Sequence, residues 1–357
     1  MLSEPIATRG TASNPANRFE KIHLEPDADW NPEESPLPGT QFLRDKTSTI
    51  IAYNDSPDVG FDASINPYRG CEHGCIYCYA RPSHAYLDLS PGIDFETKLF
   101  AKTNAAELLR AELGKPGYRP SPIALGANTD CYQPIERKYK ITRQILEVLA
   151  ECNHPVTMVT KSALVERDLD LLAPMAEKNL VRVFVSIGSL DRELARKLEP
   201  RAASPQRRLD ILRALSGAKV PCGVMVAALI PALNDKTMEH VLEAAAAAGA
   251  EEAAYVIMRL PNELKDLFKE WLAAHYPQRA DHVISIVHQM RGGRDNDPRF
   301  GTRMSGVGNF ADLIAKRFDI ACRKYRLNEH GAGRRRAELE CGLFKPPAAN
   351  PGQFALF

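Results

Sequence analysis

Long apolar runs are missing from this sequence of 357 residues. A membrane-spanning helix needs about 18 or more consecutive apolar residues, so the sequence predicts no such span and no membrane partner. Residues 1–15 are polar and lack the apolar segment that a signal peptide requires. Together these two absences lead us to expect a cytoplasmic protein.

An excess of one charge sign is also missing. The 46 Lys and Arg residues almost balance the 45 Asp and Glu residues, so the formal net charge is only +1. The chain therefore has no overall field that would indicate or exclude a nucleic-acid partner, and only local patches can do so. The contents of 44% hydrophobic and 25% charged residues are ordinary for a globular protein.

Cysteine is too sparse for a disulfide framework. Eight cysteines in 357 residues cannot provide the dense crosslinking that holds small secreted domains together. Three of the eight lie within residues 71–78, whereas the other five are scattered singly. In a reducing compartment such a cluster indicates a metal or cofactor site rather than disulfide bridges.

Short β-rich runs alternate with helical patterns between residues 49 and 261. The strand candidates are residues 63–66, 123–128, 156–161, 181–187, 223–229 and 254–259. The helix candidates between them are residues 104–113, 142–152, 166–178, 205–216 and 236–248. This repeated order predicts an α/β fold with a parallel sheet and right-handed crossovers. Periodicity alone leaves open whether the sheet is doubly wound or part of a barrel.

The sequence divides into four parts. Residues 1–48 are rich in Pro, Asn, Asp and Glu without a sustained period, so we expect an irregular N-terminal extension. Residues 49–261 form the expected β/α core. Helical patterns at 263–275, 281–290 and 310–327 predict a helical C-terminal extension over 262–327. Residues 328–357 are irregular, and we expect a flexible tail there.

The cysteine cluster follows the first predicted strand. Gly70 and Gly74 allow the loop that carries Cys71, Cys75 and Cys78 to curl around a bulky inorganic group. Three thiolates from one loop can bind three irons of a cubane cluster, which leaves the fourth iron open to a substrate or cosubstrate.

Two alternatives concern the same cysteines. A zinc knuckle needs four ligands, commonly from two separated pairs. The fourth ligand here would be His73, His84 or a distant cysteine, and none of these has the spacing of a zinc site. The cysteines can also be core residues without any ligand.

The pattern Cys-x3-Cys-x2-Cys, with Tyr77 just before the last cysteine, resembles the signature of the radical S-adenosylmethionine (SAM) superfamily. This resemblance implies a [4Fe-4S] cluster whose open iron binds the amino and carboxylate groups of S-adenosyl-L-methionine. Reductive cleavage then yields a 5′-deoxyadenosyl radical that abstracts hydrogen from a substrate. The resemblance also implies an electron donor such as flavodoxin or ferredoxin. Its partial (β/α)6 TIM barrel agrees with the six β/α units and places the reactive groups at the carboxyl ends of the strands.

A narrower resemblance covers residues 56–327. The stretches 66–82, 128–136, 160–162, 198–203 and 259–261 are similar to uncharacterised members of the spore photoproduct lyase-like, or DNA repair photolyase-like, branch. This resemblance implies a lyase-like reaction in DNA repair. Radical modification of RNA, a peptide or a small molecule is a second interpretation. A non-catalytic iron–sulfur or zinc binding module is a third.

Three residues at the end of the second predicted strand are candidates for SAM binding by this resemblance. Asn128, Thr129 and Asp130 occupy the place where the superfamily has a motif that contacts the methionine amino group. Tyr77, within the cysteine motif, is a further cofactor-binding candidate. Thr129 can instead be a helix cap.

Three more candidates follow the later strands. Lys161 ends the third strand and, as a compact cation, suits the methionine carboxylate. Ser186 ends the fourth strand, near the expected ribose or carboxylate. Arg208 begins the next helix and can pair with the same carboxylate in bidentate fashion. Alternatively, Ser186 caps a helix and Arg208 pairs with Asp210 or Glu199 at the surface.

Cys131 and Tyr132 are catalytic candidates. In spore photoproduct lyase a cysteine hydrogen donor quenches the substrate radical, and Cys131 follows the second strand, where it can face the barrel mouth. Alignment of the strand ends, however, places the lyase donor at or near Ala127. A half-buried structural cysteine is the alternative. Tyr132 is a candidate for radical relay or for stacking on the substrate.

Residues 290–345 are locally basic, with 13 Lys and Arg against 7 Asp and Glu. This segment includes Arg291, Arg294, Arg299 and Arg303 among several glycines. It is compatible with a surface that contacts the phosphate backbone of DNA, or with an ordinary solvated charged face.

The last five residues, from Gln353 to Phe357, resemble the Gln-x-x-Leu-Phe peptide by which bacterial repair proteins dock onto the sliding clamp. Gln353 would supply the polar anchor, and Leu356 and Phe357 the apolar ones. A Pro- and Gly-rich stretch, 346–352, precedes them as a tether. Because five-residue motifs often match by accident, an accidental match is one alternative, and a tail that folds back onto the body is another.

Overall fold

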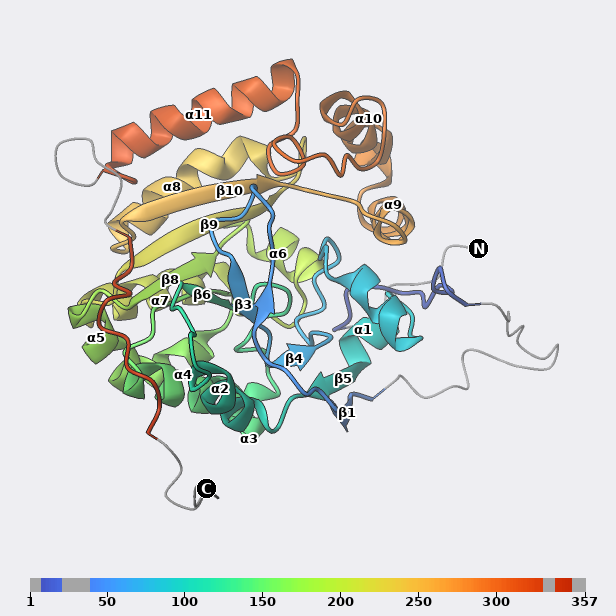
Figure 1. The fold of residues 1–357 in the computed structure, drawn as a ribbon. Helices are drawn as coiled ribbons and strands as arrows, with labels where there is room; N and C mark the ends of the chain where they lie inside the picture. Colours follow the sequence, from blue (N-terminus) through green and yellow to red (C-terminus); the bar gives the residue numbers. More distant parts are fainter. Residues whose placement is uncertain (1–7, 21–38, 330–337, 349–357) are drawn as a thin grey trace.

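The computed structural model describes residues 8–20, 39–329 and 338–348 (Figure 1). Its main sheet has seven strands in the order β10-β9-β8-β7-β6-β3-β2. Six of them are parallel: β3 (Ala63–Ile65), β6 (Ile123–Leu125), β7 (Val156–Thr160), β8 (Val181–Ser186), β9 (Cys222–Leu229) and β10 (Glu252–Ile257). The short β2 (Ala52–Tyr53) pairs antiparallel with β3 at one edge.

The predicted β/α series is confirmed. The helices that follow the strands are α2 (Ala105–Leu113), α4 (Ile141–Glu151), α5 (Leu169–Glu177), α7 (Pro205–Gly217) and α8 (Met238–Ala247). The short 3-10 helices η3 (Ala163–Asp168) and η4 (Asp235–Thr237) precede α5 and α8. The parallel sheet with its covering helices is the expected partial (β/α)6 TIM barrel (Figure 1).

Strand sequence explains how the sheet holds its core. In β8 the residues Val181, Val183 and Val185 are fully buried and alternate with partly exposed ones, as the twofold period of a strand requires. The predicted strand at 123–128 stops early, at Leu125. Gly126 adopts a φ of +78°, which an L residue rarely adopts, and turns the chain away from the sheet.

Three further helices follow β10. They are α9 (Leu264–His275), α10 (Ala280–Met290) and α11 (Asn309–Tyr325), close to the predicted bounds. Helix α11 lies over α8 (Figure 1) and is held there by Arg317, which binds the Glu239 carboxylate at 2.7 Å. The rings of Tyr255 and Phe318 pack 4.7 Å apart and join α11 to β10.

A second, three-stranded sheet has no counterpart in the sequence prediction. It consists of β1 (Gln41–Arg44), β5 (Lys98–Ala101) and β4 (Tyr68–Arg69), in that order. Strand β1 falls within the segment that we expect to be irregular. All four of its residues are exposed, so no hydrophobic period marks it, and its pairing partner lies more than 50 residues away in sequence.

Several short helices complete the fold. They are η2 (Arg81–Leu87), α1 (Ile93–Thr97), α3 (Glu136–Tyr139), α6 (Arg192–Leu198) and η5 (Pro277–Arg279). Each is too short for a helical period to reveal it in the sequence. Both η2 and α1 lie beside the cysteine loop, which makes them important for the site.

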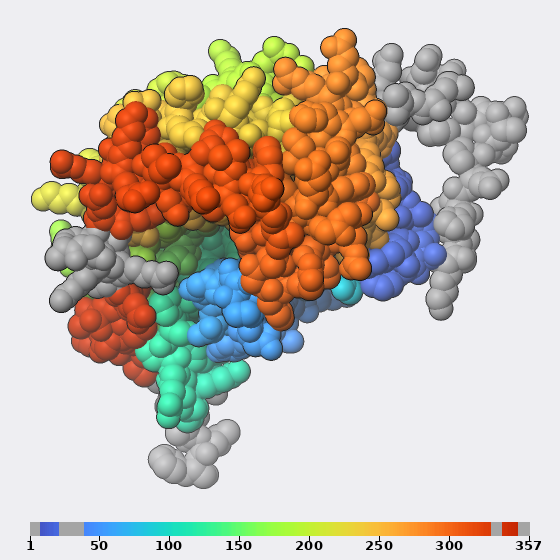
Figure 2. Space-filling model, turned by 90° about the horizontal axis from the view of Figure 1, so that it is seen from above, coloured from blue at the N-terminus to red at the C-terminus, as the bar shows by residue number. Residues whose placement is uncertain are grey.

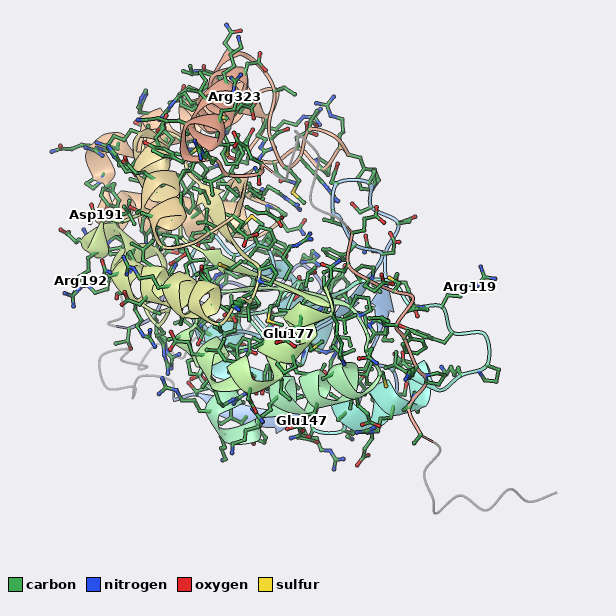
Figure 3. The ribbon with its side chains drawn as sticks, turned by 90° about the vertical axis from the view of Figure 1, so that its left-hand side faces the viewer. Arg119, Glu147, Glu177, Asp191, Arg192 and Arg323 are labelled. Atoms are coloured by element: carbon green, nitrogen blue, oxygen red, sulfur yellow. The ribbon has the colours of Figure 1, made fainter. Side chains whose placement is uncertain are left out.

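Charged side chains lie at the surface of the β/α fold. Glu147 on α4, Glu177 at the end of α5, Arg192 at the start of α6 and Arg323 on α11 project away from the body (Figure 3). Within the described ranges, no helix is both long and apolar enough to cross a bilayer.

Residues 338–348 form a strap along the end of the barrel where the strands begin. The Glu340 backbone N–H donates to Asn179, just before β8, and the Lys345 N–H donates to Cys152, just before β7. Phe344 packs against the rings of Tyr118 and His154, which also contact each other. The predicted clamp-binding residues Gln353, Leu356 and Phe357 lie outside the described residues.

Candidate cluster and cosubstrate site

The three clustered cysteines occupy one loop at the carboxyl end of β3. Cys71 and Cys75 are buried, Cys78 is partly exposed, and all three are free thiols. The Cys71 backbone N–H donates to the Phe95 carbonyl at 2.9 Å, and the Ile76 N–H donates to the Leu198 carbonyl at 3.0 Å. The loop is therefore anchored on one side by α1 and on the other by the end of α6.

Arg81 fixes the shape of this loop from behind. Its guanidinium is completely buried and donates to the carbonyls of Cys75 at 2.8 Å and Gly74 at 3.0 Å. It also pairs with the buried Glu96 carboxylate at 2.6 Å. Glu96 in turn accepts the Gly10 backbone N–H at 3.0 Å. One buried ion pair thus joins the cysteine loop, α1 and the N-terminal stretch 8–20.

Glycines make this close packing possible. Gly70 and Gly74 have φ values of +75° and +65°, which confirms their predicted role in curling the loop. A Cβ at Gly10 would lie 1.7 Å from the Gly74 carbonyl oxygen, so no other residue fits there. The sequence analysis does not identify Gly10, because the contact joins residues 64 positions apart.

The cysteine set fits an iron–sulfur cluster better than a single metal ion. In the part of the chain that the structure describes, no three His, Cys, Asp or Glu side chains converge on one ion position. A cubane cluster needs no such convergence, because each thiolate binds a different iron. Burial, followed by nearby Asp130, raises the pKa of Cys71, and burial raises that of Cys75 to about 12. Such thiols ionise only beside a group that supplies positive charge, as bound iron does.

Asp130 ties the cysteine loop to the ends of β6 and β7. Its carboxylate accepts the Lys161 backbone N–H and the Thr160 hydroxyl, each at 2.8 Å. His73 Nδ1, from the cysteine loop, lies 3.3 Å from the same carboxylate. Burial favours the neutral acid, but His73 and Lys161 outweigh burial and lower the pKa of Asp130 to about 2. The carboxylate is therefore charged and already occupied by protein donors.

The other two residues of this group also hold the loop after β6. The Thr129 hydroxyl donates to the Tyr68 carbonyl at 2.8 Å, so it does not cap a helix. The Asn128 backbone N–H donates to the Asn66 side chain at 2.7 Å. The Asn128 side chain itself is exposed beside the cysteine loop, which leaves its amide available to a ligand.

Arg208 belongs to a buried network rather than to an open binding surface. It pairs with Glu199, as one alternative predicted, but the pair is buried rather than at the surface. Arg208 also donates to the carbonyls of Ser186 at 2.9 Å and Ala203 at 2.8 Å. The Tyr77 hydroxyl donates to the same Glu199 carboxylate. The network therefore positions Tyr77 within the cysteine loop.

Ser186 and Glu199 complete this region. The Ser186 hydroxyl donates to the Ala227 carbonyl at 3.1 Å, so it also does not cap a helix. Glu199 is absent from the predicted site residues. Burial opposes its ionisation, but Arg208 and Lys161 keep its pKa below the usual value.

Lys161 is a predicted site residue whose charged group is available to bind a ligand. Its ammonium lies 5.9 Å from the centre of the Tyr77 ring. Burial disfavours the charge, but Cys75 and Glu199 more than compensate and raise the pKa of Lys161. Among the described residues, none forms a hydrogen bond or ion pair with its Nζ atom. A cation held between the cysteine loop and Glu199 is suited to an anionic ligand.

Cys131 and Tyr132 lie deeper than the site. Both are fully buried in the main hydrophobic core. The Tyr132 hydroxyl donates to the Asp168 carboxylate at 3.1 Å, and burial raises the pKa of both residues. The Cys131 thiol is therefore enclosed by core side chains rather than half-buried.

Tyr79 lies at the barrel mouth but is not among the site residues predicted from the sequence. It follows Cys78 directly, its side chain is about half exposed, and its hydroxyl donates to the Ala127 carbonyl after β6. Its position next to the last cysteine is a signal that could have identified it.

Some of the arginines of the predicted basic surface are engaged within the protein. Arg291 is buried and donates to four backbone carbonyls, including that of Met258 at 3.0 Å. Arg299 pairs with Asp297, and Arg303 pairs with Asp58. Arg294 is exposed. The pairing of Arg303 with Asp58 joins the loop after α10 to the loop between β2 and β3, where orange and blue surfaces meet (Figure 2).

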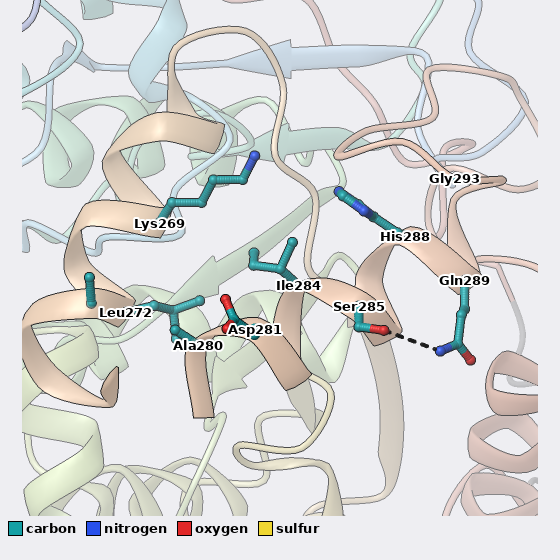
Figure 4. Close-up of a pocket in the computed structure, with 10 residues that line it drawn as sticks. Lys269, Leu272, Ala280, Asp281, Ile284, Ser285, His288, Gln289 and Gly293 are labelled. Atoms are coloured by element: carbon teal, nitrogen blue, oxygen red, sulfur yellow. Dashed lines mark hydrogen bonds between the residues drawn. The ribbon is translucent and has the colours of Figure 1, made fainter. Parts of the chain in front are cut away.

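A groove of about 740 Å³ lies between α9 and α10 (Figure 4). Leu272, Ala280 and Ile284 line its floor, and Lys269 and His288 stand at its rim. None of the candidate site residues lines it, so the groove does not bear on the cluster chemistry.

This chain is similar in sequence to one protein family and to several known proteins. The sequence matches the radical SAM superfamily over residues 65–245, half of the chain. An uncharacterised protein of Mycobacterium bovis is 41% identical over 232 residues, which cover 64% of this chain and 68% of that protein. An uncharacterised protein of Methanocaldococcus jannaschii is 28% identical over 178 residues, or 50% of this chain and 63% of that protein.

The chain belongs to the radical SAM superfamily.

Superfamily membership confirms the cofactors that the resemblance implies, a [4Fe-4S] cluster and SAM. Among solved structures, spore photoproduct lyase complexed with dinucleoside spore photoproduct is similar, with a TM-score of 0.55 and 17% identity over 80% of this chain and 77% of that chain. A form of the lyase with bound AdoMet gives a TM-score of 0.52. At this identity the likeness shows a shared fold, the expected partial barrel.

We predict that Arg81→Met destabilises the protein and empties the cluster site. The substitution leaves the Glu96 carboxylate buried without its cation, which costs about 3–5 kcal/mol. Thermal unfolding and the iron content after reconstitution measure the effect. Arg213→Met, at an exposed pair, is the control and should change neither. A double variant, Arg81→Met with Glu96→Gln, should recover part of the stability; an iron-replete, stable single variant would refute the role of this pair.

Proposed function

We propose that this protein is a radical SAM enzyme that abstracts a hydrogen atom from a nucleobase of DNA. The observation that carries the proposal is the set of three free thiols, Cys71, Cys75 and Cys78, on one anchored loop beside the unpaired ammonium of Lys161. These thiols would hold the [4Fe-4S] cluster. When bound, the reduced cluster and SAM supply the 5′-deoxyadenosyl radical for hydrogen abstraction.

The chain's own residues orient the cosubstrate. Lys161 would bind the methionine carboxylate as a charge-assisted partner. The exposed Asn128 amide is suited to the methionine amino group, with Thr129 and Asp130 fixing the loop that presents it. Tyr77 sets the distance between Lys161 and the cysteine loop.

The buried network behind Tyr77 keeps this arrangement rigid. Glu199 holds the Tyr77 hydroxyl, and Arg208 holds Glu199. Ser186 contributes its carbonyl to Arg208. We therefore assign Ser186 and Arg208 to positioning, in place of the direct ligand contacts first expected.

Cys131 has two interpretations, hydrogen donation and core packing. Its complete burial, and that of Tyr132 beside it, support core packing. On this interpretation the second hydrogen transfer uses a group other than the Cys131 thiol.

DNA as the substrate rests on three observations of unequal weight. The fold is shared with a lyase solved with a dinucleoside photoproduct. An exposed tyrosine, Tyr79, lies next to the last cluster cysteine. The C-terminal sequence resembles a sliding-clamp peptide. An electron would come from flavodoxin or ferredoxin, and the partly exposed Cys78 marks the side of the cluster nearest to solvent.

We predict that Cys71→Ala, Cys75→Ala and Cys78→Ala each abolish the cluster and SAM cleavage. Each removes a thiolate that an iron requires. After anaerobic reconstitution, the wild type should be brown, hold about four irons, and form 5′-deoxyadenosine with dithionite and SAM. Cys341→Ala, at a free cysteine in the strap, is the matched control and should behave as the wild type. A wild type that forms no 5′-deoxyadenosine would refute the proposal.

We predict that Lys161→Met weakens SAM binding roughly 10- to 100-fold, because a hydrogen bond to a charged group contributes about 1.5–3 kcal/mol. Titration of the reconstituted protein with SAM measures the change in Kd. Lys178→Met, at an exposed lysine behind the barrel, is the control and should bind SAM as the wild type does. Equal affinities of the two variants would remove Lys161 from the binding site.

We predict that deuterium moves from base-deuterated, ultraviolet-irradiated DNA to 5′-deoxyadenosine. Mass spectrometry of the nucleoside detects the transfer, and unirradiated DNA of the same sequence is the control. Deuterium that arrives only from labelled RNA, peptide or metabolite pools would contradict the DNA assignment. It would leave the radical chemistry itself in place.

A further inference from the structure

Arg259 and Tyr79 form a pair at the barrel mouth that neither the cluster nor SAM requires. Arg259 follows the end of β10 by two residues, and Tyr79 follows the last cluster cysteine. The Arg259 guanidinium carbon lies 5.5 Å from the centre of the Tyr79 ring. Tyr79 as a whole residue is 48% exposed, so it lies at the surface of the protein next to the last cluster cysteine.

The hydrogen-bonding capacity of Arg259 is mostly unused. Its Nε atom is buried and has no partner, and its Nη1 atom contacts only the Met304 sulfur at 3.4 Å. A thioether is a weak acceptor. In residues 8–20, 39–329 and 338–348, no carboxylate pairs with this guanidinium. A buried N–H without a partner is costly, which is a sign of a group kept for a ligand.

The surroundings of Arg259 carry excess positive charge. Burial and the neighbouring Arg303 both lower the pKa of Arg259. Burial and the charge of Arg259 in turn lower the pKa of Arg291. The nearby Asp58 is already engaged by Arg303. Asp297, the carboxylate that acts on Arg291, is paired with Arg299. The guanidinium groups here therefore outnumber the carboxylates beside them, and an anion would neutralise the excess positive charge.

The pair also lies at the same end of the barrel as the cluster. The Tyr79 hydroxyl donates to the Ala127 carbonyl beyond β6, and the Ile257 N–H donates to the Met304 carbonyl at the end of β10. Carboxyl ends of parallel strands meet at one edge of the sheet. A ligand bound to Arg259 would thus lie beside the loop that carries Cys78.

We propose that Arg259 binds a phosphate of a nucleic-acid strand and that the Tyr79 ring stacks on the adjacent base. This assignment rests on the proposed function and names the part of the substrate that the mouth recognises. The planar guanidinium matches phosphate oxygens in bidentate geometry. The exposed ring beside it can stack on a nucleobase. The carboxylate of a peptide would gain no such stacking contact.

Binding of a fluorescein-labelled oligothymidylate 12-mer to the reconstituted full chain, followed by anisotropy at several salt concentrations, tests the proposal. Arg259→Gln should weaken binding roughly tenfold and reduce the salt slope by about one, as expected for one lost phosphate contact. Tyr79→Leu should weaken binding roughly 5- to 100-fold, with the slope unchanged. Arg119→Gln, at an exposed arginine remote from the mouth (Figure 3), should change affinity less than about twofold.

Further measurements separate loss of the phosphate contact from misfolding of a variant. Arg259→Lys should restore part of the affinity while the salt slope returns to that of the wild type. A methylphosphonate 12-mer, which lacks the phosphate charges, should bind the wild type at least as weakly as the normal strand binds Arg259→Gln, and Arg259→Gln should weaken its binding no further. Thermal unfolding and iron content show whether each variant is folded.

The proposal is overturned if Arg259→Gln and Arg119→Gln bind alike, if the wild type binds no oligonucleotide, or if an acidic peptide competes as well as the 12-mer does. Its failure is distinct from failure of the proposed function. Formation of 5′-deoxyadenosine by the wild type needs no oligonucleotide, and oligonucleotide binding needs no SAM cleavage.

Discussion

The buried pair of Arg81 and Glu96 is the interaction on which the rest of the site depends. Arg81 donates to the carbonyls of Gly74 and Cys75 in the cysteine loop, and the Glu96 carboxylate neutralises Arg81. Isolated buried ions are among the most expensive groups in a protein, so neither residue is stable there without the other. Their geometry therefore leaves the loop one conformation, with its three sulfurs presented at the end of the strands.

Most other charges near the mouth are also consumed internally. Asp130 is bound by backbone and hydroxyl donors, and Arg208 is bound by Glu199 and carbonyls. Among the described residues at the mouth, two of the cations have neither a carboxylate partner nor a strong hydrogen bond from the charged group. These are Lys161 and Arg259, which come from strands at different positions around the barrel. The mouth is thus a rigid polar frame with two positions open to anions.

Local signals made the framework predictable from sequence. The six parallel strands have β-branched runs, their helices have a helical period, and the cysteine spacing needs only eight consecutive residues. The second sheet, the pair of Arg81 with Glu96, and the contact of Gly10 with Gly74 depend on residues far apart in sequence. No periodicity records such pairings.

The burial of individual residues was also not predictable from the sequence. A residue after a strand can face the mouth or turn into the core, and Cys131 turns into the core because Gly126 bends the chain first. The basic segment showed the same limitation, since composition counts Arg291 and Arg303 as surface charges although both are bound within the protein.

The strap formed by residues 338–348 gives the molecule a polarity. It crosses the end of the barrel where β7 and β8 begin, whereas the cysteine loop lies where the strands finish. The strap therefore lies at the end of the barrel opposite the cysteine loop. It adds its backbone bonds and ring contacts at the base of the barrel, away from the loop where the radical chemistry is proposed.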